Sequence, residues 1–290
     1  MSIPPLTLGA SMLGNRAEGV ELATALLRSP YGAVDTSNNY ADGRSESLLG
    51  DALRSWSEPT APATLYSKAD ADPTTGVFDG DRVWRSWEET TKRLGVERLP
   101  MYHLHDPYGM TVAEAAAPGG AIEALVALRA QGLVGSIGIA AGRRRLVEEY
   151  VRTDVFNAVL THNRYTLVDQ SAAGIIEAAT ERGMTVFNAA PFGGGILAGS
   201  SPDRYAYQPA RPEVLAFVSK LSSLCASWDV PLAAAALHFS LRSPLVHSTV
   251  VGVSSLARLA ALDELVAVEV PDGFFEAVGE LGTPPVALDE

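Results

Sequence analysis

The sequence predicts an α/β protein that folds as a (β/α)₈ barrel. Short apolar segments alternate with helix-like segments along the chain, and this pair occurs eight times. Such an alternation favours parallel strands joined by right-handed crossover helices. A chain of 290 residues also has the length that one such barrel requires. No linker or low-complexity segment interrupts the pattern, so we expect residues 1–290 to form a single domain.

The predicted strands are unbroken apolar runs and not strict alternations of apolar and polar residues. Such runs are typical of parallel strands that are covered on both faces. In chain order they span residues 6–11, 33–37, 64–68, 101–105, 136–140, 158–163, 185–190 and 248–253.

A helix-like pattern follows each of these strands. The predicted helices span residues 17–29, 44–56, 81–94, 119–131, 142–152, 171–182, 212–227 and 255–267. The segment LRAQGLVGSIGIA illustrates one junction, because a basic residue late in the helix is followed by a glycine stop and then by the next strand.

Three longer irregular segments, 69–80, 106–118 and 192–211, each follow a predicted strand. In a barrel, the segments that follow strands lie over the C-terminal mouth, where binding sites are built. The tail, residues 270–290, has no strong pattern, and it either closes over the mouth or remains loose.

The composition favours an acidic, cytoplasmic protein. The chain has 22 Lys and Arg against 34 Asp and Glu, a net charge of −12, which disfavours binding to nucleic acid or to an anionic membrane. The single cysteine, Cys225, excludes an internal disulfide framework and favours a reducing compartment. The start MSIPPLTLG lacks the features of a signal peptide, and no apolar run is long enough to span a bilayer. The oligomeric state stays open between a monomer and a small homo-oligomer.

Four polar side chains lie near the ends of three successive predicted strands. Asp35 and Tyr40 belong to the end of the second strand, Lys68 ends the third and His105 ends the fourth. Taken singly, each has an ordinary explanation as a turn residue, a solvated charge or a hydrogen-bonded core residue. Neighbouring strands lie about 5 Å apart, so the four groups can meet.

Together these side chains suit the transfer of a proton to or from an oxygen atom. A tyrosine titrates near pH 10, and an adjacent lysine ammonium would lower that pKa. The aspartate would hold the lysine, and the histidine would hold a substrate oxygen. This set contains no nucleophile and no store of electrons, so it implies a redox partner such as a nicotinamide.

At these residues the sequence resembles the aldo-keto reductase family. VDTSNNYADGRSESLLGDAL, YSK and LHDP resemble its Asp, Tyr, Lys and His segments, and GSIGIA, VFNAAPFGGGIL and VVGVSSLARLAAL extend the resemblance over most of the chain. The resemblance implies a barrel with a nicotinamide across its mouth and a tetrad of Asp35, Tyr40, Lys68 and His105. In that tetrad Tyr40 would be the acid–base group.

LTHNRYTLVDQSA and NAAPFGGGILAG are most similar to the aldose 1-dehydrogenase branch of that family, which includes L-fucose and D-threo-aldose dehydrogenases. The branch implies oxidation of a sugar hemiacetal, such as that of L-fucose, to a lactone, with Tyr40 as the base. Pyridoxal 4-dehydrogenase-like proteins are close relatives, so oxidation or reduction of pyridoxal or of a general aldehyde or ketone is the alternative.

The resemblance also implies a set of residues that contact the cofactor. They are His162, Asn163, Pro191, Phe192, Gly193, Gly195, Gly252, Val253, Ser254, Ser255 and Arg258. Ala140 and Ala141 stand where many relatives hold the carboxamide with Ser-Asn, so His162 or Asn163 is expected to replace them. Ala189 stands where many relatives stack a Tyr on the nicotinamide ring, and Phe192 lies nearby.

The segment around residue 252 bears on the choice between NAD and NADP. A strand runs into a helix here, so backbone N–H groups and the helix dipole can meet a phosphate. Gly252 replaces a lysine that NADP-preferring relatives pair with the 2′-phosphate, whereas Arg258 remains. NAD is therefore favoured, and dual use stays open. Ser254 or Ser255 also suits a helix N-cap.

A metal-dependent hydrolase is the main competing class of enzyme. His103, His105 and Asp106 have a spacing that points two imidazoles into the barrel, as zinc sites require. Further inward ligands are needed, and the other histidines are poorly placed for that role.

A Rossmann fold and a barrel without enzymatic activity are weaker interpretations. Gly193-Gly194-Gly195-x-x-Ala198 suggests the Rossmann fold, but a long loop follows these glycines, which more simply let the cofactor approach the backbone. A barrel that binds a nucleotide without turnover would have little use for a complete tetrad.

Overall fold

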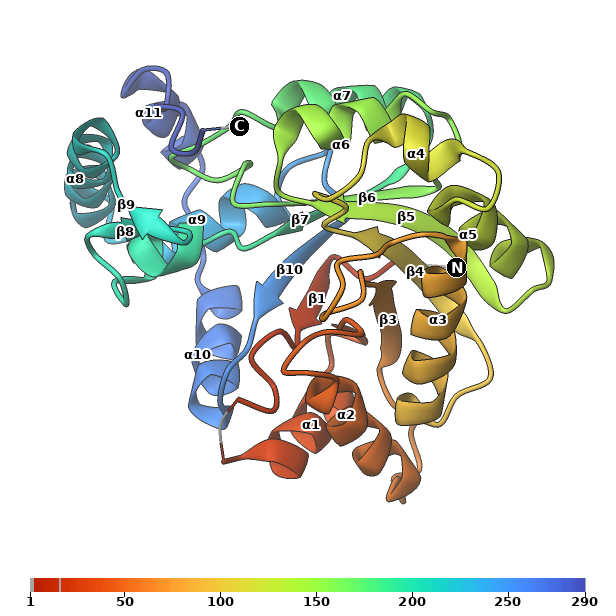
Figure 1. Cartoon of the computed structure of the whole chain (residues 1–290). Coiled ribbons are helices and arrows are strands. Elements are labelled where there is room, and N and C mark those ends of the chain that lie inside the picture. The colour runs from red at the N-terminus through yellow and green to blue at the C-terminus, as the bar shows by residue number, and fades with distance from the viewer. Residues whose placement is uncertain (1–2, 16, 290) are drawn as a thin grey trace.

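Eight parallel strands close into a barrel in the computed structural model, which describes residues 3–15 and 17–289 (Figure 1). Seven of the strands follow one another around the barrel in chain order, and the eighth closes it by pairing with the first. Their bounds are β1 (Leu6–Gly9), β2 (Ala33–Asp35), β3 (Thr64–Ala69), β4 (Leu99–His105), β5 (Val134–Ala141), β6 (Ala158–His162), β7 (Thr185–Ala189) and β10 (Ser248–Gly252). The predicted fold class is confirmed, and the open sheet of the Rossmann interpretation is wrong.

Helices surround the strands and cover the outside of the barrel (Figure 1). The main helices that follow the strands are α1 (Gly19–Arg28), α2 (Arg44–Arg54), α3 (Gly80–Leu94), α5 (Ala121–Ala130), α6 (Arg144–Val151), α7 (Ala173–Glu181) and α10 (Leu256–Ala267). Between β7 and β10 the chain forms two helices, α8 (Pro212–Ser227) and α9 (Leu232–Leu241). The predicted segment 212–227 is α8, but α9 packs against β10 and α8 packs outside it on α9.

The irregular segments contain short elements that the sequence pattern did not reveal. Segment 106–118 holds α4 (Val112–Ala116), whose N-terminus is closed by a capping box between Thr111 and Glu114. Segment 192–211 holds the 3₁₀ helix η1 (Gly193–Ala198) and an antiparallel hairpin of β8 (Arg204–Tyr205) and β9 (Gln208–Pro209). The tail forms α11 (Phe274–Glu280).

The tail is fixed to the loops around the mouth. The buried Arg164, just after β6, donates hydrogen bonds to the carbonyls of Leu288, at 2.8 Å, and Asp289. The amide of Ala287 donates to Asp169 Oδ2 at 2.8 Å. Of the two expectations for residues 270–290, the loose tail is therefore wrong for its described part.

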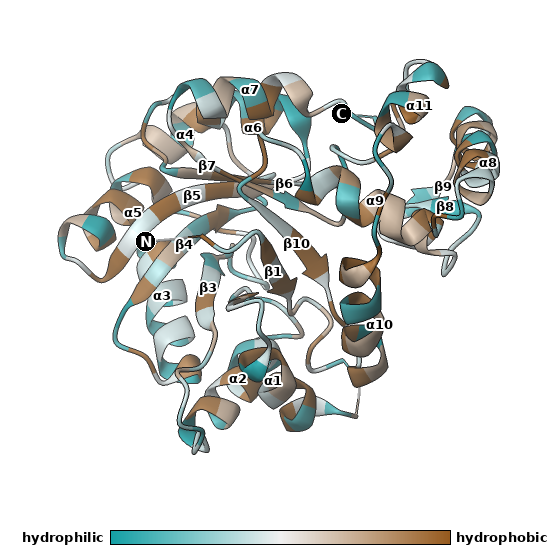
Figure 2. Ribbon diagram, turned by 180° about the vertical axis from the view of Figure 1, so that it is seen from behind, coloured by the Kyte–Doolittle hydropathy of each residue, from teal (hydrophilic) through white to brown (hydrophobic). Residues whose placement is uncertain are grey.

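Strand alternation sorts the side chains into two apolar layers. Leu65, Leu104 and Ile139 point outward into the large core beneath the helices. The inward residues include Tyr66, Met101 and Phe187, which fill the barrel interior. Brown hydrophobic segments run along β1 and β10 (Figure 2).

The inward-facing positions continue to the C-terminal ends of the strands, where the residues become polar. Because successive inward positions differ by two, Lys68 follows Tyr66 and His105 follows His103. Asp35 faces the same way, since it is in register with Tyr66 on the neighbouring strand. Strand register thus directs these three chemical groups into the same mouth.

Helix α3 has well-defined ends, and its N-terminus lies beside this mouth. Asp79 caps it by accepting a hydrogen bond from the amide of Arg82 at 2.8 Å, an interaction worth about 1 kcal/mol. It ends at Gly95, whose φ of 73° is a left-handed conformation that glycine adopts without strain. On its inner side, Arg82 and Ser86 form hydrogen bonds with the backbone of Asp70, directly after β3.

In the described part of the chain, no single helix is long and apolar enough to cross a membrane, although α8 and α9, bent by 97° at their junction, pass that test as a pair.

Candidate active site

Asp35, Tyr40 and Lys68 meet at the mouth of the barrel. The Lys68 ammonium donates a hydrogen bond to Asp35 Oδ2 at 2.6 Å and another to the Thr36 carbonyl at 2.6 Å. Its third contact is the hydroxyl of Tyr40, at 3.2 Å, and the nitrogen also lies 4.6 Å from the centre of that ring. All three donors of the ammonium therefore have partners. The side chains of Lys68 and Asp35 are only 1% and 6% exposed, so water screens this pair weakly.

The Asp35 carboxylate keeps Lys68 charged in spite of its burial. Burial alone would lower the pKa of Lys68, but the charge of Asp35, together with Tyr40, raises it above its ordinary value. The sequence expectation that the aspartate holds a charged lysine agrees with this geometry.

The electrostatic balance at Tyr40 differs from the sequence expectation. Burial raises the pKa of Tyr40 to about 12, and Asp35 also raises it, whereas Lys68 lowers it without compensating in full. The lysine therefore limits the rise of the pKa but does not bring it below the ordinary value. In the protein without cofactor, Tyr40 carries its proton at neutral pH.

His105 completes the group of four. Its ring meets that of Tyr40 edge to face, with centroids 5.5 Å apart. Its Nδ1 lies 2.7 Å from Asp70 Oδ1 and 3.0 Å from Ser37 Oγ. The structure thus brings Asp35, Tyr40, Lys68 and His105 together.

The sequence pattern did not single out Asp70 and Ser37. Asp70 is 6% exposed, and its Oδ2 accepts hydrogen bonds from the Ser37 hydroxyl and, at 2.9 Å, from the Asn39 amide. Burial acts to raise the pKa of Asp70, but its contacts with His105, Ser37 and Asn39 together hold that pKa below its ordinary value. One signal was available, because Asp70 continues the inward series of Tyr66 and Lys68 by two more residues.

His162 and Asn163 lie at the end of β6, on the same mouth. His162 Nδ1 is 3.1 Å from Asn163 Nδ2, and its ring packs against the backbone of Gly142, where an added Cβ would lie 2.5 Å from the ring. Burial lowers the pKa of His162, although Asp106, with its Oδ1 4.0 Å from Nε2, acts to raise it. Asn163 Oδ1 and Asp106 Oδ1 are buried and have no hydrogen-bond partner within the described residues.

The glycine-rich loop after β7 packs closely against other parts of the protein. A Cβ on Gly193 would lie 2.5 Å from the ring of Tyr205, and one on Gly194 would lie 2.6 Å from the backbone of Ala206. All three glycines of this loop have positive φ. They make room for the protein's own hairpin, so the absence of side chains here serves the fold of the loop.

The two residues before these glycines are partly or fully covered. Pro191 is buried, and Phe192 is half-buried against both large apolar clusters. The carbonyl of Phe192 accepts hydrogen bonds from the amides of Gly195 and Leu197, at 3.0 and 3.2 Å, and so begins η1. The Phe192 side chain therefore packs against the protein's own apolar residues next to this loop.

The junction of β10 and α10 is open on the side of Gly252. A Cβ at Gly252 would meet nothing within 4 Å, while Val253 is buried beside it. Ser254 precedes the N-cap of α10, Ser255, whose Oγ accepts from the amide of Arg258 at 3.2 Å. The N-cap interpretation of Ser255 is therefore confirmed. The Arg258 side chain is exposed.

A carboxylate already occupies part of this helix N-terminus. Glu18, from the loop between β1 and α1, accepts a hydrogen bond from the amide of Leu256 at 3.1 Å. The contact joins residues 238 positions apart, which explains why the sequence pattern did not reveal it. It places a negative charge where the sequence led us to expect a phosphate of the cofactor.

The histidine spacing that suggested a hydrolase does not form a metal cluster. His103 is fully buried inside the barrel, neither of its ring nitrogens has a partner within the described residues, and burial holds its pKa well below the ordinary value. Within residues 3–15 and 17–289, no group of three or more His, Cys, Asp or Glu side chains is arranged to hold a metal ion. The geometry gives the hydrolase interpretation no support.

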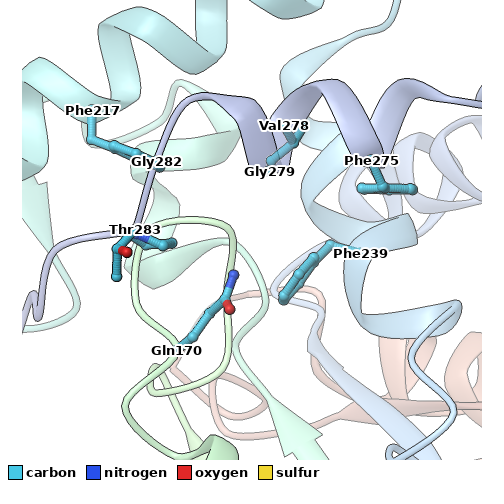
Figure 3. A pocket seen from close by; sticks show the side chains of 9 residues that line it. Gln170, Phe217, Phe239, Phe275, Val278, Gly279, Gly282 and Thr283 are labelled. Atoms are coloured by element: carbon cyan, nitrogen blue, oxygen red, sulfur yellow. The ribbon is translucent and has the colours of Figure 1, made fainter.

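A cavity of about 440 Å³ lies apart from these residues (Figure 3). Phe217 of α8, Phe239 of α9 and Phe275 of α11 line it, together with Gln170 from the loop after β6. No member of the tetrad contributes to it, so the cavity lacks the acid–base chemistry found at the barrel mouth.

The comparisons with known proteins agree with this fold. The sequence profile described as the Aldo/keto reductase family matches residues 5–282. The chain belongs to this family. Aldo/keto reductases are oxidoreductases that use NAD(P)H and act on small carbonyl compounds, and the protein is therefore an oxidoreductase.

Two curated relatives resemble this aldo/keto reductase along almost its whole length. D-threo-aldose 1-dehydrogenase from Pseudomonas sp is 32% identical, over 97% of this chain and 94% of the relative. Pyridoxal 4-dehydrogenase from Microbacterium luteolum is 28% identical, over 97% of this chain and 95% of the relative. The resemblance to aldose and pyridoxal dehydrogenases that the sequence segments indicated is therefore confirmed.

Solved structures show the same fold. The aldo-keto reductase AKR11C1 from Bacillus halodurans, in its holo form, superimposes with a TM-score of 0.80 at 19% identity, over 97% of this chain and 93% of that one. The glycerol dehydrogenase AKR11B4 from Gluconobacter oxydans gives a TM-score of 0.74 at 17% identity, over 96% and 90% of the two chains.

The residues at the mouth fit a nicotinamide cofactor. A carboxamide offers two N–H donors and one acceptor, and the unpartnered Oδ1 of Asn163 is a buried acceptor of the matching kind. The exposed Arg258 and the backbone of α10 suit the other end of a dinucleotide. Asn163 Oδ1 has no competing partner within the described residues, whereas Glu18 already accepts from the backbone amide of Leu256.

Proposed function

We propose that this aldo/keto reductase is an aldose 1-dehydrogenase that oxidises a sugar hemiacetal, such as that of L-fucose, to its lactone. The observation that carries the proposal is the hydrogen bond between the Lys68 ammonium and the Tyr40 hydroxyl, with Asp35 behind the lysine. This arrangement stabilises a phenolate at the mouth of the barrel. The 32% identity to D-threo-aldose 1-dehydrogenase supports a sugar substrate.

In the proposed mechanism, Tyr40 is the base that removes the proton of the anomeric hydroxyl. Lys68 stabilises the phenolate that accepts this proton, and Asp35 keeps the lysine charged and in place. His105 holds a hydroxyl of the substrate through Nε2, because its Nδ1 already faces Asp70. A bound nicotinamide supplies the acceptor for the hydride that leaves C1.

We assign the binding of the cofactor to the two ends of the mouth. His162 and Asn163 would hold the carboxamide, and Ser254, Ser255 and Arg258 would lie near the adenosine end. NAD is favoured over NADP for two reasons. Gly252 provides no cation for a 2′-phosphate, and Glu18 adds a negative charge at the N-terminus of α10, which repels one.

A panel assay tests this proposal directly. The purified protein is mixed with NAD or NADP and with single aldoses, including L-fucose, L-galactose and the D-threo aldoses, and the absorbance of the reduced cofactor is followed. We expect reduction of NAD with at least one aldose and slower reduction of NADP. Binding of NAD without its reduction by any aldose would contradict the assignment.

Pyridoxal is the second candidate substrate, because the 28% identical relative is a pyridoxal 4-dehydrogenase. The same panel includes pyridoxal and simple aldehydes and ketones. A kcat/KM for pyridoxal above that of every aldose would move the assignment to this second candidate. Cytoplasmic location, and a state no larger than a small homo-oligomer, stay predictions from the sequence.

A further inference from the structure

Asp70 and His105 form a buried pair at the mouth of the barrel. Asp70 Oδ1 lies 2.7 Å from His105 Nδ1, and the two side chains are 9% and 12% exposed. Asp70 is itself fixed from behind by α3, because its amide donates to Ser86 Oγ at 3.3 Å and its carbonyl accepts from Arg82 Nε at 2.9 Å. The carboxylate therefore has little freedom to turn away from the imidazole.

We propose that Asp70 is a positioning residue that holds the proton of neutral His105 on Nδ1 and so leaves Nε2 as a hydrogen-bond acceptor for a substrate hydroxyl. The inference rests on the proposed function for the identity of the substrate, but not for the position of the proton. Asp70 thus determines whether Nε2, the ring nitrogen that faces the substrate, carries a proton.

The hydrogen-bond donors around Asp70 fix the position of this proton. An ionised carboxylate only accepts hydrogen bonds. The Ser37 hydroxyl and the Asn39 amide both donate to Oδ2, which leaves Oδ1 for His105. If Nδ1 carried a lone pair, two acceptors would face each other at 2.7 Å in a site that excludes water, which is a costly arrangement.

The contact of Ser37 with the ring agrees with the same proton position. Ser37 Oγ lies 3.0 Å from His105 Nδ1 and has only one proton to donate. Because that proton goes to Asp70, the hydroxyl oxygen can only accept from the ring, which again requires a proton on Nδ1.

Other charged groups near the ring act less strongly. Asp106 Oδ2 lies 3.7 Å from Nε2, beyond hydrogen-bond distance, and its side chain is 36% exposed. Lys68, His103 and His162 also face this end of the barrel. None of these groups makes a hydrogen bond to the ring, so the 2.7 Å contact with Asp70 decides the tautomer.

A histidine with a bare Nε2 suits an alcohol better than a carbonyl. The single proton of the anomeric hydroxyl goes to Tyr40, so the hydrogen bond that Nε2 accepts comes from a neighbouring hydroxyl of the substrate, whereas a carbonyl oxygen requires a donor. The neutral form of His105 set by Asp70 therefore favours a substrate with several hydroxyl groups, such as an aldose. A buried aspartate fixes the tautomer of a catalytic histidine in the same way in serine proteases.

Asp70→Asn reverses this selection while changing the size of the side chain very little. The amide of Asn39 still requires an acceptor at its present position, 2.9 Å away, so the new carboxamide places its oxygen there. Its NH₂ group then faces Nδ1 as a donor. The proton of the imidazole must move to Nε2, and the substrate hydroxyl loses its acceptor.

The test measures the tautomer in the enzyme without substrate. The ¹⁵N resonances of the imidazoles are recorded at a pH well above the ordinary pKa of histidine, and the spectrum of His105→Gln identifies the residue. We expect a protonated Nδ1 in the wild type, a protonated Nε2 in Asp70→Asn, and the wild-type pattern in Asp72→Asn. Asp72 is the matched control because it lies in the same loop and only closes a turn at Thr74 and Thr75.

A kinetic measurement accompanies the spectrum. For the aldose that the panel assay identifies, Asp70→Asn should raise KM about 5- to 100-fold, the range expected when a buried polar group loses its partner, with a smaller change in kcat. A proton on Nε2 in the wild type would overturn the proposal, even if the variant failed to fold. If no aldose were oxidised, the proposed function would fail, while the spectrum would still decide the role of Asp70.

Discussion

The ammonium of Lys68 donates a hydrogen bond to the hydroxyl of Tyr40 at 3.2 Å, from a position where it is almost completely shielded from water. This contact joins the third strand of the barrel to the loop that follows the second strand. It couples the charge of the lysine to the protonation of the phenol, and most of the expected behaviour of the site depends on it.

Replacement of Tyr40 by Phe should abolish most turnover and leave cofactor binding almost unchanged. The variant keeps the ring, and so the edge-to-face contact with His105, but it loses the group that transfers the proton. General acid–base catalysis typically contributes about 10²- to 10⁴-fold to the rate, so we expect kcat to fall by this factor. The measurement pairs steady-state kinetics with titration of NAD against protein fluorescence. Residual activity near that of the wild type would contradict the acid–base role of Tyr40.

Replacement of Lys68 by Met should cost both activity and stability. It leaves the carboxylate of Asp35 buried without its charged partner, and breaking a buried pair in this way costs about 3–5 kcal/mol. Arg152→Met is the matched control, because it removes an exposed pair with Glu148 in which the side chains are 64% and 38% exposed, and such helix pairs contribute only about 0.3–0.5 kcal/mol. Urea unfolding of both variants measures the difference. Equal losses would show that Asp35 does not depend on Lys68.

The rates of oxidation and of reduction should respond differently to pH. Since the pKa of Tyr40 is about 12 in the protein without cofactor, the phenol is protonated at neutral pH. Oxidation requires the phenolate, whose fraction grows about tenfold per pH unit below the pKa, so the rate of oxidation should rise with pH. Reduction requires the phenol, so its rate should stay level until the pH approaches the pKa. An oxidation rate that is already level at neutral pH would contradict this and would show that the pKa of Tyr40 falls below neutral once cofactor and substrate are bound.

The sequence predicted the tetrad because strand alternation and parallel pairing are local rules. Asp35, Lys68 and His105 share one face of adjacent strands, and that placement follows from spacing alone. The pKa of Tyr40 could not be predicted in the same way, because it depends on how much water the folded site excludes. The sequence indicated that the charge of Lys68 lowers the pKa of Tyr40, but not that burial raises this pKa by more.

The contacts that the sequence did not reveal join distant loops. Glu18 meets Leu256 through a loop whose geometry has no short-range signal, whereas for Asp70, which meets His105, the only signal was its spacing of two residues from Lys68. The glycines of η1 show the same limit. Their pattern indicated room for the cofactor beside the backbone, but the contacts of this loop with the protein's own Tyr205 and Ala206 became visible only in the structure.

Replacement of Glu18 by Gln should improve the binding of NADP more than that of NAD. The carboxylate accepts a hydrogen bond from the Leu256 amide at the N-terminus of α10, where a 2′-phosphate would meet its negative charge. Unit charges about 4 Å apart in water interact by about 1 kcal/mol, so we expect the Kd for NADP to fall about fivefold. Glu177→Gln is the matched control, since this residue is exposed on α7, on another side of the barrel from α10 (Figure 1). Titration of both dinucleotides at low ionic strength measures the effect, and an unchanged ratio of the two Kd values would refute it.

Replacement of Arg164 by Ala should release the C-terminal tail. The guanidinium is 4% exposed and joins the carbonyl of Gly142, at 3.0 Å, to the tail carbonyls of Leu288 and Asp289. Each hydrogen bond to a charged group contributes about 1.5–3 kcal/mol, so the variant should unfold at a lower temperature and lose its last residues to carboxypeptidase faster than the wild type. Arg182→Ala is the control, because Arg182 pairs with Asp154 at the surface, away from the tail.

Release of the tail should also weaken NAD binding, because Arg164 directly follows Asn163. A variant that lost its tail contacts but bound NAD as the wild type does would show that the tail stabilises only the fold.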